Sequence, residues 1–185
     1  MTPDSGAAAP LGTGAMPAPS LARRMTCFVY ESMLLFGVGL VPGAVGALFF
    51  AQTRQQHALQ GETALQLFAW LVYGVYFVWF WSARGQTLAM QTWHIGLVSA
   101  SGERVTQRRA LARYLACCIA WFAPPTLVAT ALRLPPWLGL GLTAAWIAFY
   151  ALLALAEPGR QFWHDRWCGT RLVDTRPDWL RPRPR

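Results

Sequence analysis

The sequence predicts an all-α membrane protein with four transmembrane helices, a small cytoplasmic hairpin loop and a cytoplasmic tail. Two observations predict this class. Hydrophobic residues make up 55% of the chain and charged residues only 13%. The hydrophobic residues also form unbroken runs rather than helical or alternating stripes, a pattern typical of a chain embedded in a membrane and a poor match to a soluble core.

The chain divides by composition into three parts. Residues 1–20 are rich in alanine, proline and glycine without hydrophobic periodicity, so we expect a disordered N-terminal leader. It is not interpreted as a signal peptide, because the hydrophobic run behind it is too long and lacks a convincing cleavage site. Residues 21–174 form the predicted transmembrane domain, and residues 175–185 a basic flexible tail. The predicted spans cover residues 25–51, 64–82, 110–132 and 137–156.

The first two hydrophobic runs are joined by a polar stretch. The run 25–51 is longer than the about 20 residues needed to cross a bilayer, and it contains a single charge, Glu31. We expect it to tilt, or to kink at Pro42. Residues 52–63 are polar and predict a loop. The second run, 64–82, ends in a cluster of aromatic residues of the kind that lie at the headgroup level.

A polar segment, residues 84–109, separates the second and third runs. Within it, Trp93, Ile95 and Leu97 alternate with other residues as in a β-strand, and the following Ser-Gly pair at 101–102 is typical of a turn. We therefore expect a small hairpin inside this loop.

The third and fourth runs differ in regularity. Arg113 lies near the start of the third run, where an arginine can extend its charge to the interface. Pro124 and Pro125 lie in its middle and remove backbone hydrogen bonds, so this span is expected to be kinked or to consist of two half-helices. The fourth run, 137–156, contains no charge.

The positive charges indicate an orientation. All 16 are arginines, and with four spans all except Arg54 and Arg133 lie on the side that carries both termini. The positive-inside rule then places both termini of this multi-pass protein in the cytoplasm. Short basic segments beside spans attract anionic lipid headgroups, so the expected partner is the lipid bilayer and not nucleic acid.

The sequence gives little support for metal binding or catalysis. The four cysteines are interpreted as reduced packing residues, because three lie in hydrophobic runs and the fourth in the arginine-rich tail. No Cys-x-x-Cys or His-x-x-x-His spacing is present, and neither is a Gly-x-Ser-x-Gly motif or a glycine-rich phosphate loop. We therefore expect no metal, no cofactor and no enzymatic activity. The cysteines are Cys27, Cys117, Cys118 and Cys168.

A polar cluster is predicted at the cytoplasmic end of the helices. Arg24 and Glu31 are separated by about two helical turns, so they lie on one face about 10 Å apart along the axis. An ionisable group inside a span is costly and marks a candidate functional site. Two interpretations stay open: a structural Arg24–Glu31 pair, which we favour, and a carboxylate that carries a proton or a cation.

The tail contributes two more candidate residues. Asp165 can accept hydrogen bonds from Arg24, Arg84 or Arg113 and so dock the tail under the helices, or it can extend a polar pathway from Glu31. His164 can relay protons, although a neutral histidine held by hydrogen bonds is the more common situation. The predicted cluster comprises Arg24, Glu31, Arg84, Arg113, His164 and Asp165.

Short motifs accompany these residues in a fixed order. Residues 85–88 read Gly-Gln-Thr-Leu, and a His-Asp pair precedes Gly-Thr-Arg-Leu-Val at residues 169–173. In this order the chain resembles the RDD family of bacterial membrane proteins, named for one arginine and two aspartates, which match Arg24, Glu31 and Asp165. Glu31 is a departure from the family's aspartate, and Ala-Met at 89–90 is another, since many members have Gly-Lys there.

The resemblance implies a protein of the bacterial cytoplasmic (inner) membrane with a role in transport of an undefined ligand, and cation/proton exchange has been proposed for some members. The first hypothesis is therefore a transport-related protein in which Glu31 handles a proton or small cation, within a homo-oligomer because four helices enclose little space. The alternative is a non-catalytic scaffold, or a factor that binds lipid or protein, with a purely structural arginine–acid cluster.

Overall fold

A computed structural model describes residues 16–53, 58–157 and 159–177. Four long helices and four short elements follow one another in these ranges. The elements are α1 (Leu21–Thr53), α2 (Ala58–Ala83), α3 (Leu88–Thr92), β1 (Ile95–Ser99), α4 (Gln107–Ala131), α5 (Pro136–Ala156), α6 (Trp163–Trp167) and β2 (Thr170–Asp174).

The long helices α1, α2, α4 and α5 are each long and apolar enough to cross a membrane, which confirms the predicted class. The predicted loop at 52–63 is too long, because α1 continues to Thr53 and α2 already begins at Ala58. This stretch is polar but contains no proline and several good helix formers, so the helices extend past the end of the hydrophobic run. Likewise α1 passes through Pro42 as one helix.

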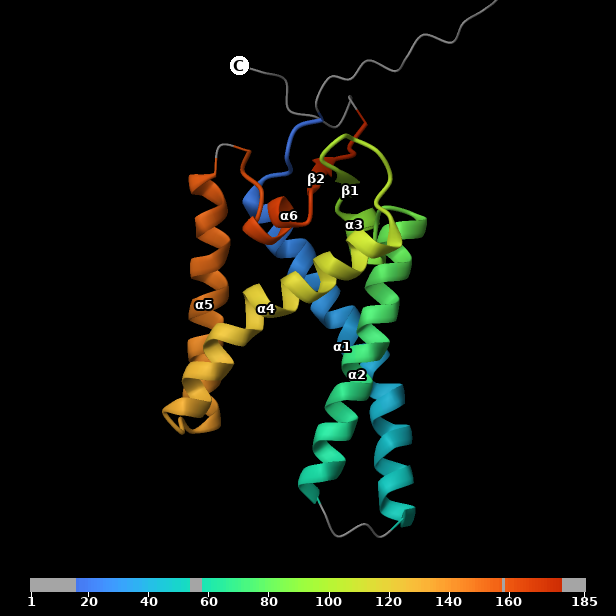
Figure 1. Ribbon diagram of the computed structural model, residues 1–185, viewed down its shortest axis with the longest axis vertical. Coiled ribbons are helices and arrows are strands. Elements are labelled where there is room, and N and C mark those ends of the chain that lie inside the picture. Colours follow the sequence, from blue (N-terminus) through green and yellow to red (C-terminus); the bar gives the residue numbers. More distant parts are fainter. Residues whose placement is uncertain (1–15, 54–57, 158, 178–185) are drawn as a thin grey trace, which may run out of the picture.

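Figure 1 shows how the helices are arranged. α1 and α2 run side by side, α4 crosses obliquely from α2, and α5 returns beside α4. The short elements α3, β1, α6 and β2 gather at one end of the helices, next to the beginning of α1. We call this the capped end. It is the part of the molecule in which the sequence-predicted polar residues meet.

α4 is one continuous helix through its two prolines, so of the two expected forms, a kinked span or two half-helices, the second is wrong. Pro124 has no N–H, and the carbonyl of Ala120 therefore lacks its helical donor. The indole Nε1 of Trp146 on α5 donates to that carbonyl at 2.9 Å. A neighbouring helix thus supplies the hydrogen bond that the proline removes, as the interior of a membrane protein requires.

Trp146→Phe is expected to lower the free energy of unfolding by about 1–3 kcal/mol, because it leaves the Ala120 carbonyl without a donor. The measurement is unfolding of the purified protein in detergent. Trp137→Phe is the matched control, since Trp137 lies in the first turn of α5 with 71% of its surface exposed. Equal losses in the two variants would contradict this role of Trp146.

The sheet corrects the predicted hairpin. β1 forms where the alternating pattern predicted a strand, but its partner is β2 from the C-terminal tail, not a strand in the same loop. The pairing is antiparallel, with Leu97 opposite Leu172. Residues 100–106 form a turn and an extended stretch without a second strand. The alternation of hydrophobic and other residues predicts a strand, but the strand that pairs with it depends on where the tail packs.

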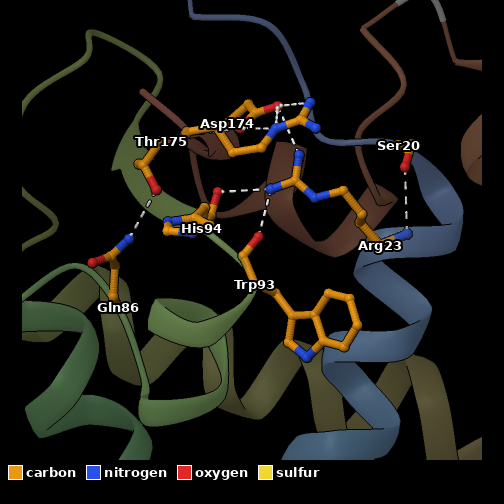
Figure 2. A network of polar contacts seen from close by, with 8 residues as sticks. Ser20, Arg23, Gln86, Trp93, His94, Asp174 and Thr175 are labelled. Atoms are coloured by element: carbon orange, nitrogen blue, oxygen red, sulfur yellow. Dashed lines mark hydrogen bonds and ion pairs between the residues drawn. The ribbon is translucent and has the colours of Figure 1, made fainter. Parts of the chain in front are cut away.

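A clamp of hydrogen bonds joins this sheet to the start of α1 and to the residues just before it (Figure 2). The guanidinium of Arg23 donates to Asp174 at 2.7 Å and to the carbonyl of His94 at 3.0 Å. The amide of Asp174 donates to the carbonyl of Pro17 at 2.9 Å, and the amide of Thr175 to that of His94 at 3.0 Å. Residues 16–20 of the predicted disordered leader are therefore attached to the sheet, while residues 1–15 lie outside the described residues.

The acid of this clamp is strongly stabilised in its charged form. Burial by itself would raise the pKa of Asp174, but hydrogen bonds from Arg176 and Arg23 outweigh it and hold the pKa well below its usual range. The predicted flexible tail thus begins with bound residues, and its part from 178 onward lies outside the described residues. Sequence reasoning assigned no role to Arg23 because its neighbour Arg24 matches the family arginine.

Candidate functional site

Five of the six predicted cluster residues are buried at the capped end. Arg24 is 4% exposed, Glu31 7% and Arg113 6%. The sixth, Arg84, is exposed and lies over the ring of Trp79 with 5.9 Å between the guanidinium carbon and the ring centroid. Arg84 is therefore outside the cluster. The remaining two are His164 and Asp165 of α6.

Glu31 is held by two hydroxyl groups. Its Oε1 accepts from the Tyr76 hydroxyl at 2.7 Å, and its Oε2 accepts from the hydroxyl of Thr87. Within the described ranges no ion pair joins Glu31 to Arg24, so the favoured structural pair is not formed. The two residues lie on one helix face as expected, but other elements supply the partners of the acid.

The Gly-Gln-Thr-Leu motif positions one of these partners. Gly85 adopts φ +69° where α2 ends, a conformation that suits glycine. Thr87 then caps α3, and its oxygen accepts the amide of Met90 at 3.2 Å. Because that oxygen accepts from the helix, its proton is free to be donated to Glu31. The Thr87 side chain thus caps the N-terminus of α3 and also binds Glu31, the buried acid of α1.

Arg113 and Asp165 form a buried ion pair between α4 and α6. The Nε of Arg113 donates to Oδ1 of Asp165 at 2.6 Å, and Asp165 is completely buried. The Arg113 guanidinium carbon also lies 4.2 Å from the ring centroid of Trp81 on α2. The tail is therefore docked by Arg113, one of the three arginines that the sequence offered as partners of Asp165.

His164 is enclosed beside this pair. Its Nδ1 lies 2.9 Å from the Tyr150 hydroxyl, whose oxygen also accepts the backbone amide of His164 at 3.3 Å. This arrangement favours the neutral tautomer with hydrogen on Nε2, 3.7 Å from Oδ1 of Asp165. Burial lowers the pKa of His164 to about 4, the charge of Asp165 opposes the shift, and Arg113 and Arg24 add to it.

In the part of the chain that the structure describes, no acid is hydrogen-bonded to Arg24. Its guanidinium carbon lies 4.6 Å from the ring centroid of Phe162, a cation–π contact. Its Nε and Nη1 are buried and have no hydrogen-bond partner within residues 16–53, 58–157 and 159–177. Asp165 attracts it electrostatically but makes its short ion pair with Arg113. The family's arginine is thus a buried cation with unused donors.

A cavity of about 610 Å³ connects these groups. We call it the interhelical cavity. Arg24, Glu31, Arg113 and His164 line it at the capped end, and most of its remaining wall is aromatic or aliphatic. Its volume falls within the about 300–1,000 Å³ typical of small-molecule sites, which likewise combine apolar walls with a few polar groups.

The four cysteines remain to be placed, together with the site residues that the sequence did not indicate. All four cysteines are free, and Cys27, Cys117 and Cys118 line the interhelical cavity. Sequence reasoning missed Tyr76 and Tyr150, because aromatic residues in spans are most simply interpreted as membrane anchors. Thr87 was noted only as part of the Gly-Gln-Thr-Leu motif, and its hydrogen bond to Glu31 could not be predicted from the sequence. The described residues contain no group of three or more metal-ligating side chains.

Comparison with known proteins identifies the family of the chain. The chain matches the RDD family over residues 18–169, a range that includes Arg24, Glu31, Arg113 and Asp165. The match ends before β2, so it does not reach the last part of the 169–173 motif. Neither the curated proteins nor the solved structures contain a match to the chain. Because the matched range covers most of the sequence, the chain belongs to the RDD family of membrane proteins.

Proposed function

We propose that this RDD protein is transport-related and that Glu31 takes up and releases a proton at the interhelical cavity. The observation that carries the proposal is the environment of this acid. Glu31 is 7% exposed, faces the cavity and is held by hydroxyls rather than by a cation. An acid locked in an ion pair resists protonation, whereas this one does not have to break such a pair first.

The hydroxyl partners suit a change of protonation state. A hydroxyl can donate to a carboxylate and, after rotation, accept from a carboxylic acid. Tyr76 can therefore stay hydrogen-bonded to Glu31 in both states. A bound metal cation is the weaker alternative, because Arg24 and Arg113 line the same cavity and repel it. A proton is thus the favoured cargo or coupling ion.

The surroundings of the protein are proposed from the arginines. Their distribution supports a multi-pass protein of the bacterial cytoplasmic membrane with both termini in the cytoplasm, in contact with anionic lipid headgroups. Many large hydrophobic side chains on the long helices are exposed, among them Phe36, Leu71 and Leu140. They are available for lipid and for a second copy of the chain. We propose neither enzymatic activity nor a nucleic-acid partner.

The alternative is a scaffold in which the cluster only fixes the fold. One observation favours it: the Arg113–Asp165 pair joins α4 to α6, and Thr87 joins α1 to α3, so both contacts assemble the capped end. On this view Glu31 is a structural acceptor and no proton moves.

Proton flux separates the two functions. The full chain is reconstituted in liposomes that contain a pH-sensitive dye, and proton movement is recorded after a step in external pH and, separately, after a pulse of Na⁺ or K⁺. We expect flux with the wild-type protein and its loss in Glu31→Gln, which keeps the size of the side chain and removes its charge. Arg84→Gln is the matched control, because Arg84 lies outside the cluster. Undiminished flux in Glu31→Gln contradicts the proposal, and no flux in any form, with Glu31→Gln only less stable, favours the scaffold.

A further inference from the structure

Among the residues that the structure describes, no acid is hydrogen-bonded or ion-paired to Arg24. Only 4% of the residue is exposed, and its Nε and Nη1 have no hydrogen-bond partner in the described ranges. Buried guanidinium donors are costly to leave without a partner. Of the neighbouring acids, Asp165 uses its Oδ1 for Arg113 and Glu31 binds two hydroxyls. Asp165 also attracts Arg24 electrostatically, but its Oδ2 has no hydrogen-bond partner among the described residues. A bound anion beside Arg24 would give this buried cation a counter-ion.

The walls of the interhelical cavity indicate the chemistry of the rest of the molecule that carries such an anion. Beyond the polar residues at the capped end, the cavity is lined by aromatic and aliphatic side chains of α1, α2 and α4. A free inorganic anion would leave this apolar wall uncovered. A molecule with one negatively charged head and an apolar chain can satisfy Arg24 and the wall together.

The opening of the cavity gives such a molecule a route of entry from the bilayer. Three of its lining residues are largely exposed: Phe36 at 69%, Trp70 at 45% and Phe122 at 45%. They come from α1, α2 and α4, three of the helices long and apolar enough to cross a membrane, so the cavity is open on a side that is available to lipid tails. A chain can therefore enter from the bilayer, while the head reaches Arg24 at the capped end.

We propose that the interhelical cavity binds an anionic amphiphile, with its head group on Arg24 and its hydrocarbon chain along the apolar wall. A carboxylate or a phosphate oxygen pair fits the fork of a guanidinium, which lysine cannot reproduce. Two sources share this chemistry, a free fatty acid and an anionic phospholipid. The binding site goes beyond proton transfer at Glu31 and does not require it.

Binding is measured by native mass spectrometry of the full chain in detergent, titrated with palmitate, phosphatidylglycerol or phosphatidylcholine. The wild-type protein is expected to bind one anionic amphiphile and to bind the zwitterionic lipid more weakly. Arg24→Gln should weaken anionic binding about tenfold or more, since a charge-assisted contact is lost. Arg24→Lys should weaken it less, and Arg84→Gln, which changes an exposed arginine outside the cavity, should leave it unchanged.

Two further variants test the proposal even if Arg24→Gln does not fold. Leu35 lines the cavity, so Leu35→Trp should fill part of it and weaken binding while Arg24 stays intact. Glu31→Gln should keep or strengthen binding, because it removes a negative charge from the same cavity. Since this variant is also the one expected to lose proton flux, failure of binding and failure of proton transfer are distinguished.

The outcomes decide both the site and the source. Preference for palmitate assigns the site to a fatty acid, and preference for phosphatidylglycerol assigns it to a phospholipid head. Equal binding of phosphatidylcholine, or equal anionic binding by the wild type and a folded Arg24→Gln variant, overturns the proposal. So does unchanged binding in Leu35→Trp.

Discussion

Asp165→Asn is expected to lower the free energy of unfolding by about 3–5 kcal/mol, because it leaves the buried charge of Arg113 without its counter-ion. The pair is enclosed, with side-chain exposures of 7% for Arg113 and 0% for Asp165. Loss of the acid also removes the ion pair that joins α6 to α4. The effect is measured by equilibrium unfolding of the purified protein in detergent.

An exposed ion pair of the same chain provides the control. Arg166 and Glu157 are 2.9 Å apart, but 69% of the Arg166 side chain is exposed. Glu157→Gln should therefore change the free energy of unfolding by less than about 1 kcal/mol. Replacing both Arg113 and Asp165 by apolar residues should restore part of the loss, since no lone charge remains. Equal effects of Asp165→Asn and Glu157→Gln would show that burial of the pair is not what matters.

The second large effect is a loss of stability in acid that is caused by His164. In the folded protein burial lowers the pKa of this histidine to about 4, whereas in the unfolded chain it should be about 6.5. The unfolded chain therefore binds a proton between these values that the folded protein does not bind. Stability from His164 is fully present above pH about 6.5 and is lost as the pH falls to about 4, by on the order of 3 kcal/mol.

The comparison of wild type with His164→Gln isolates this residue. The variant should be less stable at pH 7.5, because the contact with Tyr150 is changed, but it should lose less stability between pH 6.5 and 4.5. Asp165, Arg113 and Arg24 act on His164 and remain in both proteins. Asp174, whose pKa is depressed, adds its own loss only at lower pH, below its unfolded value. Parallel pH profiles of melting temperature would rule out a role for His164.

The sequence predicted the membrane class, and the reason is physical. Runs such as residues 137–156 can be placed only in hydrocarbon, and each must be helical there because the backbone has no other hydrogen-bond partner. The cost of burying charge also identified Glu31 inside the first span. Arg113 was expected at the interface, and Asp165 was identified in the tail, as an acid that could dock it under the helices. With four spans, the start of the first span, the start of the third span and the tail all lie on one side of the membrane, so these residues are expected at the same end of the helices.

The partners of these charges could not be predicted in the same way. Glu31 and Arg24 share a helix face, yet the acid binds Tyr76 and Thr87, because α2 and α3 bring hydroxyls closer than the arginine stem brings its charge. The strand at β1 was visible as alternation, but its partner β2 lies in the tail. Pairing across the fold depends on packing, and local patterns do not contain it.

The sequence by itself determined that this chain has four membrane-crossing helices and a few buried charges that need partners. Only the tertiary structure decided which partners they have, that Arg113 rather than Arg24 or Arg84 holds Asp165, and that Arg24 is left facing a cavity. The physical reason is one of range. Hydrophobicity and backbone hydrogen bonding act within a segment, while ion pairs, hydroxyl contacts and cavities arise between segments whose relative positions are fixed by packing.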